Sequence, residues 1–107
     1  MEYPAELELF EFFEVEPVVE NDVYAYTTSD DSGISLTLSF STADDSLQTS
    51  LQFAGRVIAV ICHEGITRLT IREDVLTCEF VQEDSRVTLT ARTRPQIHVE
   101  WSGLRTV

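Results

Sequence analysis

Apolar and polar residues alternate with a period of two over much of this chain. Between residues 36 and 41, each leucine or phenylalanine is followed by a serine or a threonine. Such alternation is typical of a β-strand with one face in a core and the other face toward solvent. Further segments of this kind lie at residues 47–53, 69–71, 76–80, 87–91 and 97–101.

Turn-forming residues separate these segments at intervals of about ten residues. They occur at residues 30–33, 43–45, 54–55, 64–65, 73–74 and 83–85. Because several of the connections are only two or three residues long, neighbouring strands are expected to pair antiparallel. The pattern predicts an all-β fold, an antiparallel meander of about eight or nine strands that forms a β-sandwich or a flattened barrel. Residues 1–107 are expected to form a single β domain.

Two segments do not follow the simple alternation. Residues 57–62 are apolar on both faces, which predicts a central strand covered on each side. Residues 5–16 fit either a strand or a short helix, and Pro17 ends the segment in both cases. As a helix, this segment has a narrow apolar stripe of Leu9, Phe12 and Phe13. The strand is the preferred interpretation.

Charge divides the chain into two unequal halves. Residues 1–55 contain twelve acidic side chains and no lysine or arginine, whereas residues 56–107 contain seven acids and seven arginines. The formal net charge of -12 therefore comes from the first half. A field of this sign repels nucleic acid and anionic membranes and attracts basic proteins. With neither an apolar span nor a basic leader, the chain is expected to be cytoplasmic.

The residues that could carry catalysis or bind a metal are few and poorly spaced. Cys62 and His63 are adjacent, so on a strand their side chains point to opposite faces. The two cysteines, Cys62 and Cys78, are expected to be reduced core residues. No zinc, calcium, phosphate-loop or dinucleotide motif occurs. We therefore expect neither an enzyme nor a cofactor, and no catalytic or metal-binding residue is assigned.

The acidic half instead suggests a surface that binds a protein. Its acids are interleaved with aromatic residues, which supply desolvated anchors while charges supply orientation and association rate. The alternative is that these acids only keep the protein soluble. The predicted partner-binding residues are Glu11, Glu14, Glu16, Glu20, Asp22, Tyr24, Tyr26, Asp30, Asp31, Asp44 and Asp45.

Four segments, at residues 12–17, 35–41, 46–51 and 99–105, resemble small bacterial immunity proteins. These are the antidotes of contact-dependent or Rhs-type polymorphic toxins. The resemblance implies that the chain binds and neutralises a cognate toxin domain. A basic, nucleic-acid-targeting toxin such as a nuclease or a deaminase would suit the acidic charge. Two alternatives remain open: a nucleic-acid mimic that inhibits another basic protein, and a β domain that binds a small ligand. The free chain is expected to be a monomer or a dimer.

Overall fold

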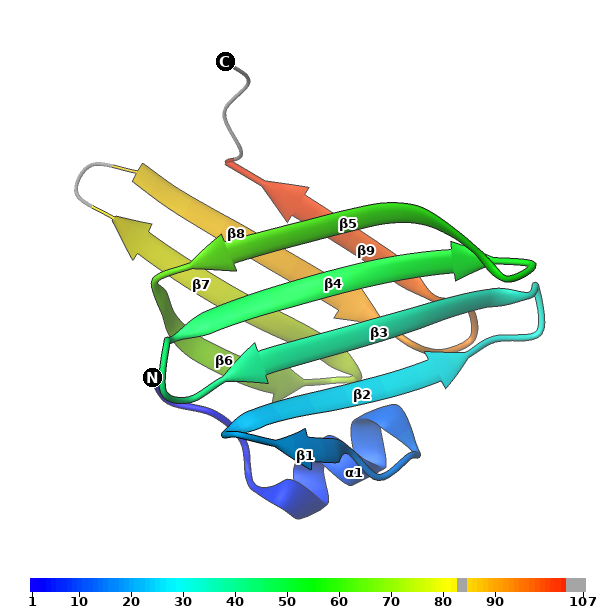
Figure 1. Ribbon diagram of the computed structural model, residues 1–107, viewed down its shortest axis with the longest axis horizontal. Coiled ribbons are helices and arrows are strands. Elements are labelled where there is room, and N and C mark those ends of the chain that lie inside the picture. The colour runs from blue at the N-terminus through cyan, green and yellow to red at the C-terminus, as the bar shows by residue number, and fades with distance from the viewer. Residues whose placement is uncertain (83–84, 104–107) are drawn as a thin grey trace.

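The computed structural model describes residues 1–82 and 85–103, except for the side chains of residues 82 and 85. Within this part of the chain, nine antiparallel strands form two sheets packed face to face (Figure 1). The prediction of an all-β sandwich is confirmed, and the sheets do not close into a barrel. The predicted turn at 83–85 includes residues 83–84, which lie outside the described residues.

The first sheet has the order β1-β2-β3-β4-β5 and the second has the order β6-β7-β8-β9. Every hydrogen-bonded pair within them joins strands that are consecutive in the chain, as the short turns predict. The strands are β1 (Val18–Glu20), β2 (Val23–Ser29), β3 (Ile34–Ser41), β4 (Ser46–Phe53), β5 (Arg56–Glu64), β6 (Ile66–Arg72), β7 (Val75–Gln82), β8 (Ser85–Arg92) and β9 (His98–Ser102).

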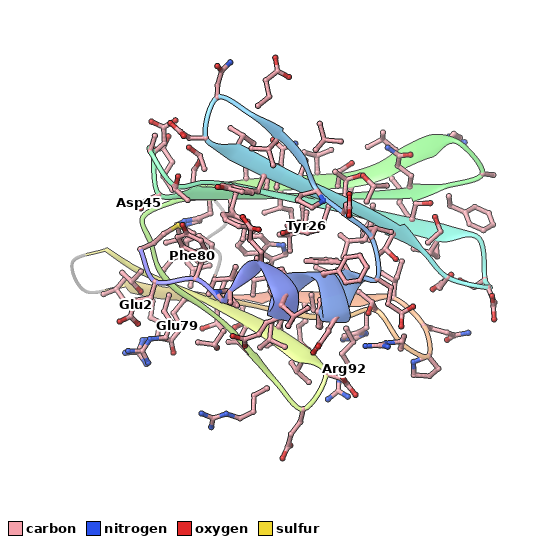
Figure 2. All side chains as sticks on the ribbon, turned by 90° about the horizontal axis from the view of Figure 1, so that it is seen from below. Glu2, Tyr26, Asp45, Glu79, Phe80 and Arg92 are labelled. Atoms are coloured by element: carbon pink, nitrogen blue, oxygen red, sulfur yellow. The ribbon has the colours of Figure 1, made fainter. Side chains whose placement is uncertain are left out.

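The core lies between the two sheets. Alternate residues of β3 and β4 point into it from the first sheet, and alternate residues of β7 and β8 meet them from the second. Tyr26 of β2 and Phe80 of β7 both lie in this space (Figure 2). The single tryptophan, Trp101 of β9, links the sheets across one side, because its indole N–H donates to the Thr49 hydroxyl of β4 at 3.1 Å.

Residues 5–16 do not form the preferred strand. An α-helix, α1 (Glu6–Phe13), occupies most of the segment and contacts β2 of one sheet and β6 of the other. It fills one open side of the sandwich (Figure 2). Leu9, Phe12 and Phe13 are buried, the stripe expected of an amphipathic helix with apolar residues at i, i+3 and i+4.

The prediction of a central strand at residues 57–62 is also wrong. The segment lies in β5, which is an edge strand of the first sheet. Val57, Ile58 and Val60 are each more than half exposed. A run of apolar residues fits a strand covered on both faces, but here no neighbouring element in the described residues covers the edge.

Candidate functional site

The geometry of α1 depends on the loop between β8 and β9, some 80 residues away. The Thr93 hydroxyl donates to the Phe12 carbonyl at 3.1 Å, and this hydrogen bond is buried. The Arg94 guanidinium donates to the Glu11 carbonyl at 3.3 Å and to the Glu14 carboxylate. These donors satisfy carbonyls at the helix C-terminus that have no partner within the helix. The loop therefore caps α1 and fixes the position of its exposed face.

That exposed face borders a groove of about 500 Å³ between α1 and the turn that joins β6 and β7. Carboxylates line the groove on both sides, and Arg94 is the one cation among its lining residues. With four acids and one arginine, the groove carries a net charge of -3. Its charged residues are Glu8, Glu11, Glu14, Asp74 and Arg94.

Apolar side chains stand beside these charges. Phe10 lines the groove with 45% of its surface exposed, and Leu7 is 67% exposed one helical turn earlier. Residues three apart lie on the same helix face, so the two side chains form a small apolar centre. We call Leu7, Glu8, Phe10, Glu11, Glu14 and Asp74 the α1 surface. Its composition, an apolar centre with charges around it, is typical of protein-binding sites.

The sequence predicted only part of this surface. Glu11 and Glu14 were among the predicted binding residues, whereas Leu7, Glu8, Phe10 and Asp74 were not. A helical interpretation of residues 5–16 would have placed Leu7 and Phe10 with the two glutamates on one face. No local pattern brings Asp74 to the helix, because its position depends on the packing of β6 and β7.

The other predicted acids do not form one continuous patch with the α1 surface. Glu16 is exposed between α1 and β1. A separate group lies where the β1–β2 turn meets the β3–β4 turn, joined by the hydrogen bond from the Thr42 N–H to the Asp22 carbonyl. This far group, as we call it, consists of Glu20, Asp22, Asp44 and Asp45. The β2–β3 turn, with Asp30 and Asp31, lies at the opposite end of β2. Since β2 has seven residues, its two ends are about 20 Å apart.

Asp30 and Asp45 use their carboxylates within the molecule. The Asp45 carboxylate lies 3.2 Å from the amino group of Met1. The Asp30 carboxylate accepts the Ser32 hydroxyl and N–H, the Ile34 N–H, and the Ile97 N–H at 2.7 Å. The Ser32 hydroxyl and these backbone donors lower the pKa of Asp30. Asp30 therefore ties the β2–β3 turn to the loop before β9, which gives it a structural role.

The predicted aromatic anchors lie mainly inward. Tyr26 is 1% exposed and stacks on Phe13 with ring centroids 4.6 Å apart, so its ring is not available at the surface. Burial, with smaller contributions from Glu6 and Tyr24, raises the pKa of its hydroxyl. Tyr24 is half-buried and stacks on Phe40. Alternation in β2 places both tyrosines on its core face, the opposite of what binding requires.

The cysteines and histidines do not come together. Cys78 is buried, and burial raises the pKa of its thiol well above the ordinary value. Cys62 is exposed, so the expectation that it is a core residue is wrong. The neighbouring His63 ring points inward and packs on Phe80 at 4.8 Å. Across residues 1–82 and 85–103, no group of three or more histidine, cysteine or acidic side chains is placed to hold a metal ion. No helix in these ranges is long and apolar enough to cross a membrane.

No protein-family model and no curated protein matches the chain. Among solved structures, it is similar to a chain of the contact-dependent growth inhibition toxin–immunity protein complex from Klebsiella pneumoniae 342. The TM-score is 0.89, with 28% sequence identity over 94% of this chain and 95% of that one. The resemblance to immunity proteins of the contact-dependent type is thereby confirmed.

Proposed function

We propose that this chain is an immunity protein, which binds the toxin domain of a contact-dependent growth inhibition system and neutralises it. It acts as an inhibitor and not as an enzyme. The observation that carries the proposal is the structural match, which spans nearly the full length of both chains. Its place of action is the cytoplasm of the cell that makes it, where an antidote must meet the toxin.

The toxin domain in this proposal is basic and acts on nucleic acid. The net charge of -12 draws such a domain toward the chain, and electrostatic steering raises association rates by about 10- to 1000-fold. An acidic inhibitor seated on a phosphate-binding surface excludes the substrate by occupying the same cationic side chains.

We place the binding site at the α1 surface. Phe10 offers an exposed ring on which an arginine or lysine of the partner stacks, and Glu8, Glu11 and Asp74 surround it. Among the described residues that line the groove, Arg94 alone is a cation, so an excess of three negative charges remains. A basic partner supplies the missing cations and covers Leu7 and Phe10 at the same time.

The first test uses the toxin domain that the proposal requires, sought among the products of the neighbouring genes. Co-expression should relieve its toxicity, and calorimetry with the purified domain should give a complex that weakens as salt is added. Continued toxicity together with no measurable binding would contradict the proposed function.

A pair of matched variants tests the site. In the first, Glu8→Gln, Glu11→Gln and Asp74→Asn remove three charges from the α1 surface. In the second, Glu20→Gln, Asp22→Asn and Asp44→Asn remove three charges from the far group. The first variant should lose affinity by roughly 100-fold, because close charge pairs at an interface have large coupling energies.

The second variant changes the net charge equally, so it controls for long-range steering. We expect it to slow association by less than about tenfold and to leave dissociation unchanged. If both triple variants lose affinity equally, only the overall field matters and the assignment of the α1 surface is wrong.

A further inference from the structure

Three of the four sheet edges in the described structure carry features that oppose pairing with another strand. β1 has only three residues and follows Pro17. β6 contains Arg68 and Arg72, and residue 2 already forms a bridge to it. β9 has five residues with charged or titratable side chains at positions 98 and 100. Short edges, charged side chains and proline are the usual means by which proteins prevent edge-to-edge pairing.

Between its two ends β5 has no charge and no proline, and its one protective feature is the bulge at Ile58, close to Arg56. It is nine residues long, and residues 57–63 contain no lysine, arginine, acid or proline. Val57, Ile58 and Val60 have exposed fractions of 55%, 56% and 55%. A long apolar edge of this kind is a template for another strand.

The neighbouring strand β4 is polar on its outer face beside the middle of β5, whereas Phe53 at its end is 49% exposed. Val60 and Cys62 pair with Ser50 and Gln48 of β4, so they stand on the outer face of the sheet beside polar side chains. β2, β3 and β4 carry no charged residue. The middle of β5 therefore exposes apolar side chains to solvent beside polar side chains of β4, which makes its exposure unfavourable.

The only charges on β5 lie at its two ends and have opposite sign. Arg56 begins the strand and Glu64 ends it. When two copies of such a strand run antiparallel, each arginine approaches the glutamate of the other copy. We propose that β5 pairs antiparallel with β5 of a second copy of this chain, joining two five-stranded sheets across a two-fold axis. This inference does not depend on the proposed function.

The symmetric register is centred on Val60, which faces Val60 of the second copy. Ala59 then faces Ile61 of the second copy. Ile58 is the extra residue of a bulge opposite Leu51 and Gln52 of β4. At the Arg56 end of β5, this bulge shifts the pairing with the second copy by at most one residue. An arginine side chain spans that offset. Because the contact uses the same strand on both copies, the assembly closes as a dimer instead of growing into a fibre.

A second copy fits this edge better than a strongly basic partner does. The interior of β5 is neutral, and its two end charges match an identical strand. β1 lies at the other edge of the same sheet, so Glu20, Asp22 and the α1 surface stay away from the interface. Much of the negative charge of each copy is therefore distant enough for salt to screen it. Asp45, whose carbonyl accepts the Gly65 N–H beside Glu64, lies at the end of β5 that approaches Arg56 of the second copy.

Analytical ultracentrifugation of the full-length chain tests the proposal directly. A single strand pair is smaller than a standard interface, so we expect a dissociation constant on the order of 1–100 µM. Val60→Lys replaces two apolar side chains at the two-fold axis with like charges, and it should raise that constant at least about tenfold, because lost apolar burial adds to the repulsion. Val18→Lys, the same change on the β1 edge, should leave it unchanged.

Charge exchange tests the orientation of the strands. Arg56→Glu and Glu64→Arg should each weaken the dimer, by about fivefold or more, and the double variant should restore it, since the pair couples. In a Cys62→Ser background, Val60→Cys should form a disulfide-linked dimer on oxidation, because opposite residues have Cβ atoms about 5 Å apart. Val18→Cys in the same background should not form a disulfide-linked dimer, because the β1 edges of the two copies do not meet.

A wild-type chain that stays monomeric at concentrations up to about 300 µM, well above the expected constant, overturns the proposal. So does a failure of the charge exchange to restore the dimer. If the wild type is monomeric and Val60→Lys abolishes toxin binding instead, the β5 edge belongs to the toxin interface and the self-pairing is wrong. The proposed function is tested separately, by the toxin-binding and co-expression experiments described above.

Discussion

Asp30 has four hydrogen-bond donors around one exposed turn, so its charged form is tied to the folded state. Its partners include the Ile97 N–H, which comes from the loop before β9 of the other sheet. The pKa of Asp30 is lowered in the folded protein, chiefly by the Ser32 hydroxyl and then by the Ile97 N–H. A lowered folded-state pKa stabilises the protein above the unfolded-state pKa, and this stabilisation is lost as pH falls.

We therefore expect Asp30→Asn to remove part of the pH dependence of stability below about pH 4, near the unfolded pKa of an aspartate. Urea denaturation from acidic to neutral pH measures this effect. The difference between wild type and variant should be largest at neutral pH and should shrink as the pH falls. Asp31→Asn, the neighbouring substitution, provides the control and should show no such trend. If the stability of the wild type and of Asp30→Asn depends on pH in the same way, Asp30 does not stabilise the fold through its charged form.

Phe10 and Phe13 of α1 are three residues apart, but one side chain is exposed and the other is buried. Phe10 is exposed in the α1 surface, whereas Phe13 is 1% exposed. Phe10→Ala should lower toxin affinity by roughly 10- to 100-fold, as truncation of an interface anchor does. Its melting temperature should remain close to that of the wild type.

Phe13→Ala should instead destabilise the fold by about 3–5 kcal/mol through loss of core packing. Thermal unfolding and calorimetry on the two variants separate the roles of the rings. A Phe10→Ala chain that unfolds early but binds normally at low temperature would show that Phe10 is structural.

At the scale of elements, alternation predicted the strands because most of them have one face in the core and one toward solvent. Residues 36–41 and 87–91 are clear examples, with Leu36 and Leu89 fully buried. The pattern failed for β5 because apolar residues on both faces are compatible with a central strand and with an unpaired edge. Only the order of strands in the sheet distinguishes these cases.

The helix was missed for a different reason. Ala5 makes no side-chain N-cap, and Glu14 takes the left-handed conformation after the helix where glycine is usual. Local signals for a helix are therefore weak. The donors that stabilise its C-terminus, Thr93 and Arg94, are distant in sequence, so no local pattern contains them.

Removal of the Thr93 hydroxyl should show how much this distant cap contributes. Thr93→Val keeps the side-chain shape and leaves the Phe12 carbonyl buried without its donor. We expect a loss of about 1–3 kcal/mol in the free energy of unfolding, measured by urea denaturation. Thr27→Val removes an exposed hydroxyl that bonds Thr37, and it should cost far less. Equal losses would indicate that the Phe12 carbonyl finds another donor.

The net negative charge of the whole molecule makes salt act in opposite directions on the free chain and on the toxin complex. Self-repulsion at a net charge of -12 opposes the compact state, so added salt should raise the melting temperature of the free chain. The same salt should weaken the toxin complex, because it screens the attraction between the partners. Scanning calorimetry and binding measurements over one range of sodium chloride concentrations compare the two directly. A melting temperature that falls with salt would mean that local ion pairs outweigh the net repulsion.

The capping of α1 by Thr93 and Arg94 also bears on how the protein is made. During synthesis the helix residues leave the ribosome before the loop that caps them, which follows some 80 residues later. Until then the nascent chain lacks the donors that hold the C-terminus of α1, and its acid-lined face has no fixed position. A ribosome that stalls before this loop releases a product without the complete α1 surface. If the α1 surface is the toxin-binding site, a chain that ends before residues 93–94 should therefore neither bind the toxin nor compete for it.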